Sequence, residues 1–134
     1  MYSKMVIERF QNPKNAGAMH GANAIGQVGG IAGSDLMKLY LKINDSGKIE
    51  IAKFKVFGCC VSIAAMDVAC DLIVGKDIEN ALKVTNKDIL KVLCDVPDHK
   101  MQCLVLAEEA IRAAIQDYYD RVEKETKKSL KKAR

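Results

Sequence analysis

Five cysteines are the residues of this chain best suited to chemistry, and their positions separate them into two groups. Cys59 and Cys60 are adjacent and stand directly before an apolar stretch with helical spacing, while Cys103 stands near the start of a second such stretch. Unpaired N–H groups and the positive dipole end at the start of a helix stabilise a thiolate. Thiolate is both the nucleophile of sulfur transfer and a soft ligand for iron or zinc. These three cysteines are therefore the candidates for a sulfur or metal site.

The remaining candidates have simpler interpretations. Cys70 lies on the apolar stripe of its predicted helix, where a cysteine is a small buried hydrophobic residue. Cys94 falls at a predicted helix C-terminus, where the dipole disfavours a thiolate. Considered by itself, Asp35 is interpreted as the cap of a turn, and His20 and His99 are expected on the surface. Two adjacent cysteines with one distant third cysteine are a weak signature of a metal site. The residues alone therefore do not decide whether these thiols are reactive or unreactive.

Two predicted strands lead to the cysteine pair. Residues 36–43, LMKLYLKI, alternate apolar and polar side chains, and residues 48–57 form a second strand after the turn NDSG. The apolar phase slips within the second strand, which predicts a β-bulge near Ala52-Lys53. Together the two strands predict an antiparallel hairpin. Residues 17–33 hold six of the nine glycines and are expected to be loop, or a weak strand flanked by loop.

Helical periodicity accounts for most of the rest of the chain. Ser3 is a possible N-cap of a first helix, and Asp77 and the Thr85-x-x-Asp88 box are expected to open two short helices. Helices are predicted over residues 3–11, 62–74, 78–84, 87–94 and 99–122. Since the strands come first and most helices follow, we expect an α+β fold in which helices cover a small antiparallel sheet.

Length and charge indicate one domain with a short basic end. A chain of 134 residues with 49% apolar residues is long enough for a single domain with a real core. Residues 121–134 hold seven basic and two acidic residues, and their net charge of +5 exceeds the net charge of +4 of the whole chain. The rest of the chain therefore lacks the basic, aromatic-lined groove that binds nucleic acid. We expect one domain over residues 1–120, a basic helical extension or tail over residues 121–134, and no nucleic-acid partner.

The same composition bears on location. No apolar stretch reaches about 18 residues, so neither a membrane span nor a membrane partner is expected. The N-terminus has charges inside its apolar pattern and no signal-peptide core. Five cysteines form an odd set without the dense spacing of a secreted disulfide scaffold. A cytoplasmic protein with reduced thiols is the expectation.

Four ordered blocks of the sequence resemble the IscU/NifU N-terminal scaffold family, which assembles iron–sulfur clusters. The likeness runs from Tyr2 to about Tyr119, and the blocks are YSKMVIERFQNPKNAG, GQVGGIAGSDLMKLYLKI, IAKFKVFGCCVSIAA and MQCLVLAEEAIRAAIQDY. The resemblance implies a single IscU/NifU-like domain of the SufE/NifU-type fold, with a small three-stranded antiparallel sheet covered by helices.

The resemblance also implies a site. The family uses three cysteines, an aspartate and a histidine. Position by position, the aspartate corresponds to Asp35, the second cysteine to Cys59 and the third to Cys103. In the family a cysteine desulfurase passes persulfide sulfur chiefly to the cysteine that matches Cys103, iron binds in the same pocket, and a [2Fe–2S] cluster forms and is transferred. The matched aspartate is associated with making the cluster labile.

This chain departs from the family pattern at several positions. The first cysteine corresponds to Gly33, the histidine corresponds to Gln102, and Cys60 stands where the family has glycine. Our leading hypothesis is that Cys60 replaces the thiolate missing at Gly33, which gives Asp35, Cys59, Cys60 and Cys103 as metal ligands. A second hypothesis is a cluster shared in a homodimer. The chaperone-docking motif L-P-P-V-K is altered to VPDHK at residues 96–100, so that docking is not carried over to this chain.

The resemblance predicts a carrier rather than an enzyme that turns over. The expected function is a scaffold that takes sulfur from a cysteine desulfurase at Cys103, binds iron, builds a transient [2Fe–2S] cluster and transfers it to recipient apo iron–sulfur proteins. One alternative is a persulfide-relay or zinc-binding relative, because zinc fits the same pocket. The other alternative is an adaptor that binds the desulfurase and has lost the metal chemistry.

Overall fold

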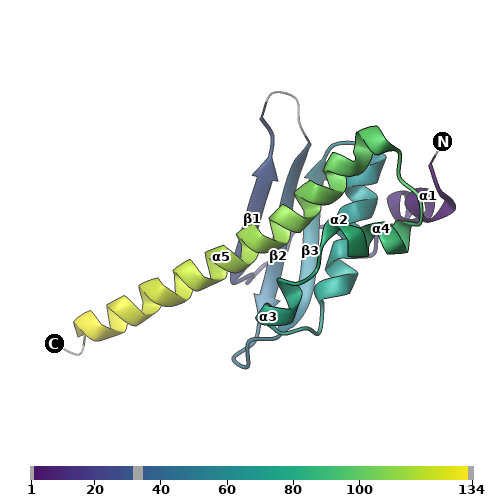
Figure 1. Cartoon of the computed structure of the whole chain (residues 1–134). Helices are drawn as coiled ribbons and strands as arrows, with labels where there is room; N and C mark the ends of the chain where they lie inside the picture. Colours follow the sequence, from purple (N-terminus) through teal and green to yellow (C-terminus); the bar gives the residue numbers. More distant parts are fainter. Residues whose placement is uncertain (1, 32–34, 133–134) are drawn as a thin grey trace.

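The computed structural model describes residues 2–31 and 35–132, apart from the side chains of residues 129, 131 and 132. Its three strands, β1 (Ala24–Gly29), β2 (Leu36–Ile43) and β3 (Ile49–Phe57), form one antiparallel sheet in the order β1-β2-β3 (Figure 1). The helices are α1 (Lys4–Gln11), α2 (Cys60–Ile73), α3 (Ile78–Ala81), α4 (Asn86–Leu93) and α5 (Met101–Lys132), and the 3₁₀ turn η1 (Asp98–Lys100) precedes α5. The α+β class with a three-stranded sheet is confirmed.

The predicted hairpin is present, but its bulge lies elsewhere. Lys42 pairs with Ile51 and Ile43 pairs with Ile49, so Glu50 is the extra residue. Ala52 is buried and already shares the inward phase of Phe54, whereas Ile51 is 45% exposed. The prediction of a bulge near Ala52-Lys53 was therefore wrong, because Ile51 resembles a core residue in sequence and a small alanine does not.

The glycine-rich stretch contains a real strand, which is β1. Gly26 lies in this strand directly beneath α5, and a β-carbon there would overlap the backbone of Ala114 and sit 2.8 Å from the carbonyl oxygen of Ala110. The missing side chain lets the helix approach the strand closely. A weak strand by composition is thus the surface on which the last helix packs.

The core lies between one face of the sheet and the two long helices. Figure 1 shows α2 and α5 crossing that face, with α5 along β1 and β2 and α2 along β3. The opposite face carries the alternate residues of β2, including Lys38, Tyr40 and Lys42. The largest fully buried side chains in this core come from β2, β3, α2 and α5 and include Leu39, Phe54, Met66, Leu104 and Ile111. This packing fixes the start of α2 beside the start of α5.

An ion-pair network fastens α1 and the following loop to α2. Arg9 pairs with the fully buried Asp67 at 2.8 Å and also with Asp71. Asn15 donates its backbone N–H to Asp67 at 2.9 Å and its side-chain amide to both aspartates. Ser3 caps α1 as predicted, since its hydroxyl accepts the N–H of Val6 at 3.2 Å. The loop that follows α1 is therefore held by specific hydrogen bonds.

Helix α5 continues well past the predicted end at residue 122. Its 32 residues span about 48 Å, and Figure 1 shows its C-terminal part extending beyond the sheet. Ion pairs one turn apart support this part, between Asp117 and Arg121 at 3.0 Å and between Glu123 and Lys127 at 3.3 Å. The division into a domain over residues 1–120 and an extension stays a prediction. None of the helices described here is long and apolar enough to cross a membrane.

Candidate metal and sulfur site

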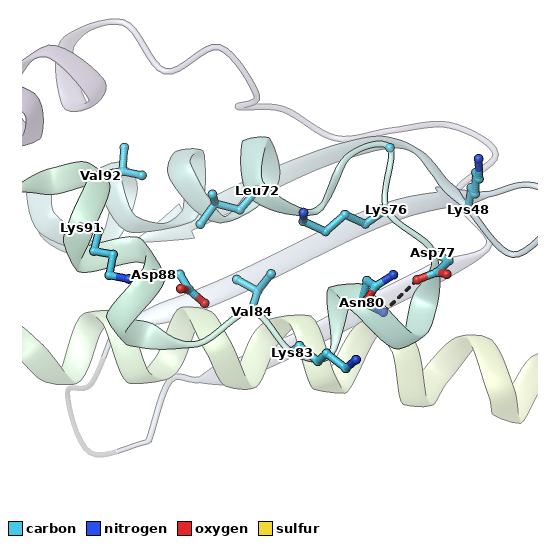
Figure 2. Close-up of a pocket in the computed structure, with 11 residues that line it drawn as sticks. Lys48, Leu72, Lys76, Asp77, Asn80, Lys83, Val84, Asp88, Lys91 and Val92 are labelled. Atoms are coloured by element: carbon cyan, nitrogen blue, oxygen red, sulfur yellow. Dashed lines mark hydrogen bonds between the residues drawn. The ribbon is translucent and has the colours of Figure 1, made fainter.

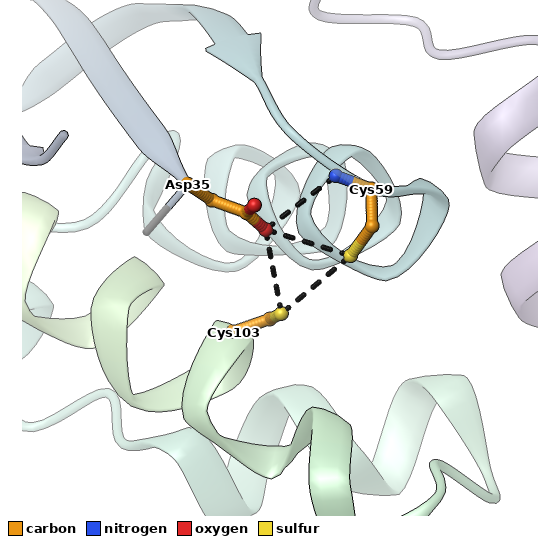
Figure 3. A group of neighbouring side chains, drawn as sticks. All are labelled: Asp35, Cys59 and Cys103. Atoms are coloured by element: carbon orange, nitrogen blue, oxygen red, sulfur yellow. Dashed lines mark hydrogen bonds between the residues drawn. The ribbon is translucent and has the colours of Figure 1, made fainter. Parts of the chain in front are cut away.

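Three of the predicted site residues meet in space. The donor atoms of Asp35, Cys59 and Cys103 all lie within 4.8 Å of one another (Figure 3). The two sulfur atoms are 3.7 Å apart, and Oδ2 of Asp35 lies 3.5 Å from the sulfur of Cys59 and 3.6 Å from that of Cys103. We call these residues the Asp35–Cys59–Cys103 triad.

Strand pairing brings the first two members together. Leu36 at the start of β2 pairs with Phe57 at the end of β3, so Asp35 and Gly58 lie just beyond the last rung of the hairpin. A β-carbon at Gly58 would overlap the side chain of Asp35 and sit 2.8 Å from its Oδ1. The absence of a side chain at Gly58 therefore makes room for the carboxylate beside Cys59.

Helix starts supply the two thiols. Cys59 is the N-cap of α2, and Cys103 is in the first turn of α5, where it is 7% exposed. Each helix packs on the sheet, and α2 also packs against α5, so their first turns lie side by side. The prediction that both cysteines lie at helix N-termini is confirmed.

Ser62 connects the members of the triad. It lies in the first turn of α2, is completely buried, donates a hydrogen bond to Oδ2 of Asp35, and its oxygen lies 3.6 Å from the sulfur of Cys59. Desolvation acts to raise the pKa of Asp35, but the hydrogen bonds from Ser62, the Cys59 N–H and the two thiols outweigh it, so that pKa lies below its usual value. The carboxylate is thus held in its charged form.

The two thiols have opposite electrostatics. Burial acts to raise the pKa of Cys59, but the Ser62 hydroxyl, the N–H groups of Ser62 and Val61 and the Cys103 thiol outweigh it, so the pKa is lowered. At Cys103, burial and the neighbouring charges of Cys59 and Asp35 raise the pKa to about 11, against a lowering by Ser62. The expectation that a helix start lowers both pKa values was right for Cys59 and wrong for Cys103, because burial, reinforced by two anionic neighbours, outweighs the helix end at Cys103.

The structure does not bring the fourth predicted ligand into the triad. Cys60 is half-buried at the first position of α2, and its thiol interacts with the Tyr2 hydroxyl, whose pKa is raised chiefly by the charge of Cys60. Gly33 lies outside the described residues, and Gln102, at the family's histidine position, is exposed. Cys70 is fully buried, and desolvation raises its pKa strongly, as expected for an unreactive thiol.

Sequence reasoning missed two residues near the site. Ser62 was passed over as part of the apolar helix, because only the fold shows which groups surround its hydroxyl. Lys100 was considered only within the altered docking motif. Its pKa is raised, first by the negative charge of Cys59 and less by those of Tyr2 and Cys103, so its ammonium group lies near the mouth of the site. The only available signal in the sequence was that Lys100 lies three residues before Cys103.

The triad has the donors for two kinds of chemistry. Two thiols and a carboxylate suit iron or zinc, since thiolates favour both metals and carboxylate is a common zinc donor. The same thiols can accept sulfur as persulfide, because thiolate attacks a sulfur–sulfur bond. The three donors leave at least one coordination position to be filled by another group.

A sizeable cavity elsewhere on the described surface is separate from this site. It has a volume of about 680 Å³ and opens between α2, α3 and α4 (Figure 2). Its lysines are exposed, and its two aspartates are occupied as helix caps, Asp77 with Asn80 and Asp88 with Thr85. None of its lining residues belongs to the triad.

Comparison with known proteins places these features in context. Residues 1–125 match the family model described as the NifU-like N terminal domain. The chain is 43% identical over 119 residues to "Iron-sulfur cluster assembly scaffold protein IscU 1" of Archaeoglobus fulgidus, which covers 89% of this chain and 77% of that protein. It is 41% identical over 120 residues to "Iron-sulfur cluster assembly scaffold protein IscU" of Escherichia coli strain K12, covering 87% of this chain and 93% of that protein.

A solved structure agrees with the fold. The crystal structure of a nitrogen-fixing NifU-like protein (N-terminal) from Brucella abortus superposes with a TM-score of 0.72, over 87% of this chain and 93% of that one. The two sequences are 17% identical, so this likeness concerns the fold alone.

Proposed function

The chain belongs to the family of the NifU-like N terminal domain, and from this premise we propose that it is a scaffold for iron–sulfur cluster assembly. Its relatives of 41% and 43% identity carry that function in their names. The observation that carries the proposal is the triad, in which residues 24 and 44 positions apart place their donor atoms within 4.8 Å. Stability alone does not require two thiols to surround a half-buried carboxylate.

Cys103 is the proposed sulfur acceptor. Its thiolate attacks the terminal sulfur of a persulfide on a cysteine desulfurase, a new sulfur–sulfur bond forms on Cys103, and the desulfurase thiolate leaves. Conversion of that sulfur to sulfide takes two electrons from an external reductant. Because the pKa of Cys103 is raised to about 11, the thiol needs to lose its proton as the attack begins. The transfer is stoichiometric, so the protein is a carrier and not a catalyst.

Iron is proposed to bind at the triad. A [2Fe–2S] cluster usually has four protein ligands, and Asp35, Cys59 and Cys103 supply three of them. Cys60 is the proposed fourth thiolate and would need to turn from Tyr2 toward the triad, or a second chain would complete the set in a homodimer. Asp35 is a harder donor than a thiolate, which favours a cluster that leaves readily. Zinc fits the same donors.

The proposed partners follow from this role. A cysteine desulfurase supplies sulfur, and recipient apo iron–sulfur proteins take the finished cluster. Docking to the specialised chaperone of the family is not proposed, since residues 96–100 read VPDHK. A cytoplasmic location stays a prediction.

One anaerobic experiment tests the proposed function. The chain is incubated with ferrous iron, cysteine and a cysteine desulfurase, and the visible absorption and bound iron, sulfide and zinc are recorded. A scaffold gains cluster absorption with equal amounts of iron and sulfide. Persulfide on Cys103 without iron would instead indicate a relay, and neither product would indicate an adaptor.

A further inference from the structure

A fully buried hydroxyl, that of Ser62, lies beside the triad. Ser62 and Asp67 are the two fully buried polar residues in the described part of the chain. Asp67 is used to fasten α1 and its loop, through Arg9 and Asn15. Burial of a hydroxyl is unfavourable unless it is hydrogen-bonded. The side-chain partners of Ser62 are Asp35, Cys59 and Cys103, and all three belong to the triad.

The hydroxyl also differs from the other donors around Asp35. Oδ2 of Asp35 faces four donors, namely the Ser62 hydroxyl, the Cys59 N–H at 3.5 Å and the two thiols. Both thiols lose their protons when they bind a metal, and they then stop donating to the carboxylate. Ser62 is the one side chain of this set that still holds Asp35 in the metal-bound state.

From this arrangement we infer that Ser62 is a positioning residue of the site, which acts through Asp35 by fixing its carboxylate over the two cysteine sulfurs. Groups that hydrogen-bond to a metal-ligating carboxylate orient it, and their loss typically lowers metal affinity about 10- to 100-fold. The inference rests on the proposed function only in taking the triad as a metal site. It does not depend on whether a cluster is built there.

Cobalt(II) binding without desulfurase or sulfide tests the inference. Cobalt(II) stands in for iron and zinc, and its thiolate absorption reports binding at the cysteines. Ser62→Ala is expected to lower the affinity about 10- to 100-fold. The substitution is mild, because alanine favours a helix and residues 64 and 65 are already alanine. Far-UV circular dichroism confirms the fold.

A double-mutant cycle separates positioning from a general loss of structure. If Ser62 acts through Asp35, the effect of Ser62→Ala disappears in an Asp35→Ala chain, where the two thiols still bind cobalt(II) at higher concentration. Thr126→Ala is the matched control, since it removes a hydroxyl that donates to the Val122 carbonyl at 3.0 Å on the exposed C-terminal part of α5. The control is expected to leave the affinity for cobalt(II) unchanged.

Three results would overturn the inference. The first is a cobalt(II) affinity in Ser62→Ala equal to that of the wild type. The second is a Ser62→Ala substitution that lowers the cobalt(II) affinity by the same factor whether or not Asp35 is present. The third is a wild-type protein that shows no thiolate absorption with cobalt(II). Failure of the proposed function has a different signature. In that case cobalt(II) binds and depends on Ser62, but the complete assembly mixture yields no cluster.

Discussion

The sulfur of Cys59 lies 3.7 Å from the sulfur of Cys103, although 44 residues separate them in the chain. The contact exists because Cys59 ends the loop from β3 into α2 while Cys103 begins α5, and both helices pack on the same face of the sheet. Asp35 reaches the same point from the start of β2. The site therefore depends on the docking of α5, which is the last element along the chain.

Gly58 is predicted to control the position of Asp35. Gly58→Ala places a β-carbon against the carboxylate, at 2.8 Å from Oδ1, so Asp35 needs to move away from the sulfurs. We expect at least about a 10-fold loss of cobalt(II) affinity, measured by titration of the thiolate absorption.

The control for this change is Gly47→Ala in the β2–β3 turn, where no atom lies within 4 Å of the added carbon. Its positive φ of 82° makes the change destabilising without affecting the site. Equal cobalt(II) affinities in Gly58→Ala and wild type would show that the close approach of Asp35 is dispensable.

Cys60 is predicted to contribute to cluster assembly although its thiol interacts with Tyr2 in the structure. Cys60→Ala is expected to lower the iron and sulfide bound after assembly, because the triad alone leaves a cluster one ligand short. Cys94→Ala is the matched control, as Cys94 is an exposed thiol at the end of α4. If Cys60→Ala assembles cluster with unchanged yield and spectrum, Cys60 is a spectator.

Metal binding is predicted to release protons near neutral pH. With its pKa raised to about 11, Cys103 is protonated in the free protein, and it binds metal only as thiolate. At pH values below this pKa, raising the pH by about one unit should therefore increase the cobalt(II) affinity about 10-fold through Cys103 alone.

An indicator dye in weakly buffered solution measures this proton release directly. Cys103→Ala is expected to release about one proton fewer per bound metal at pH of about 7. Proton release that is the same in both proteins would mean that Cys103 does not bind the metal as a thiolate.

The Arg9–Asp67 pair is predicted to be a main support of α1. Arg9→Ala leaves the charge of Asp67, which is fully buried, with Asn15 as its remaining side-chain partner, at 3.1 Å. Loss of one member of a buried pair typically costs about 3 to 5 kcal/mol of unfolding free energy. Urea denaturation measures the change. The control is Lys127→Ala, which removes an exposed ion pair with Glu123 and should lower the unfolding free energy by less than about 1 kcal/mol. A similar loss of unfolding free energy in Arg9→Ala and Lys127→Ala would contradict the prediction that the Arg9–Asp67 pair is a main support of α1.

Local patterns in the sequence were sufficient for most of the fold. Alternation over residues 36–43 gave the central strand, and the cap residues Ser3, Asp77 and Thr85 each begin a helix in the structure. These features depend on neighbours within a few residues, so a single sequence contains their cause. The last helix was predicted only to residue 122, with residues 121–134 given as a helical extension or a tail. In the structure the charged residues beyond position 122 continue the helix to Lys132 through pairs one turn apart.

The site was less predictable because its properties depend on contacts across the fold. Asp35, Cys59 and Cys103 could be nominated from helix starts and family resemblance. The raised pKa of Cys103 follows from neighbours that are remote in sequence, and so does the role of Ser62. The contact between the Cys60 thiol and the Tyr2 hydroxyl likewise joins residues that are remote in sequence.

The most direct test of the central claim is the iron and acid-labile sulfide content of single-cysteine variants after anaerobic assembly. If the triad is the assembly site, Cys59→Ala and Cys103→Ala lose nearly all bound iron and sulfide, while Cys94→Ala retains the wild-type amounts. Iron and sulfide bound at wild-type levels in Cys103→Ala would contradict the claim.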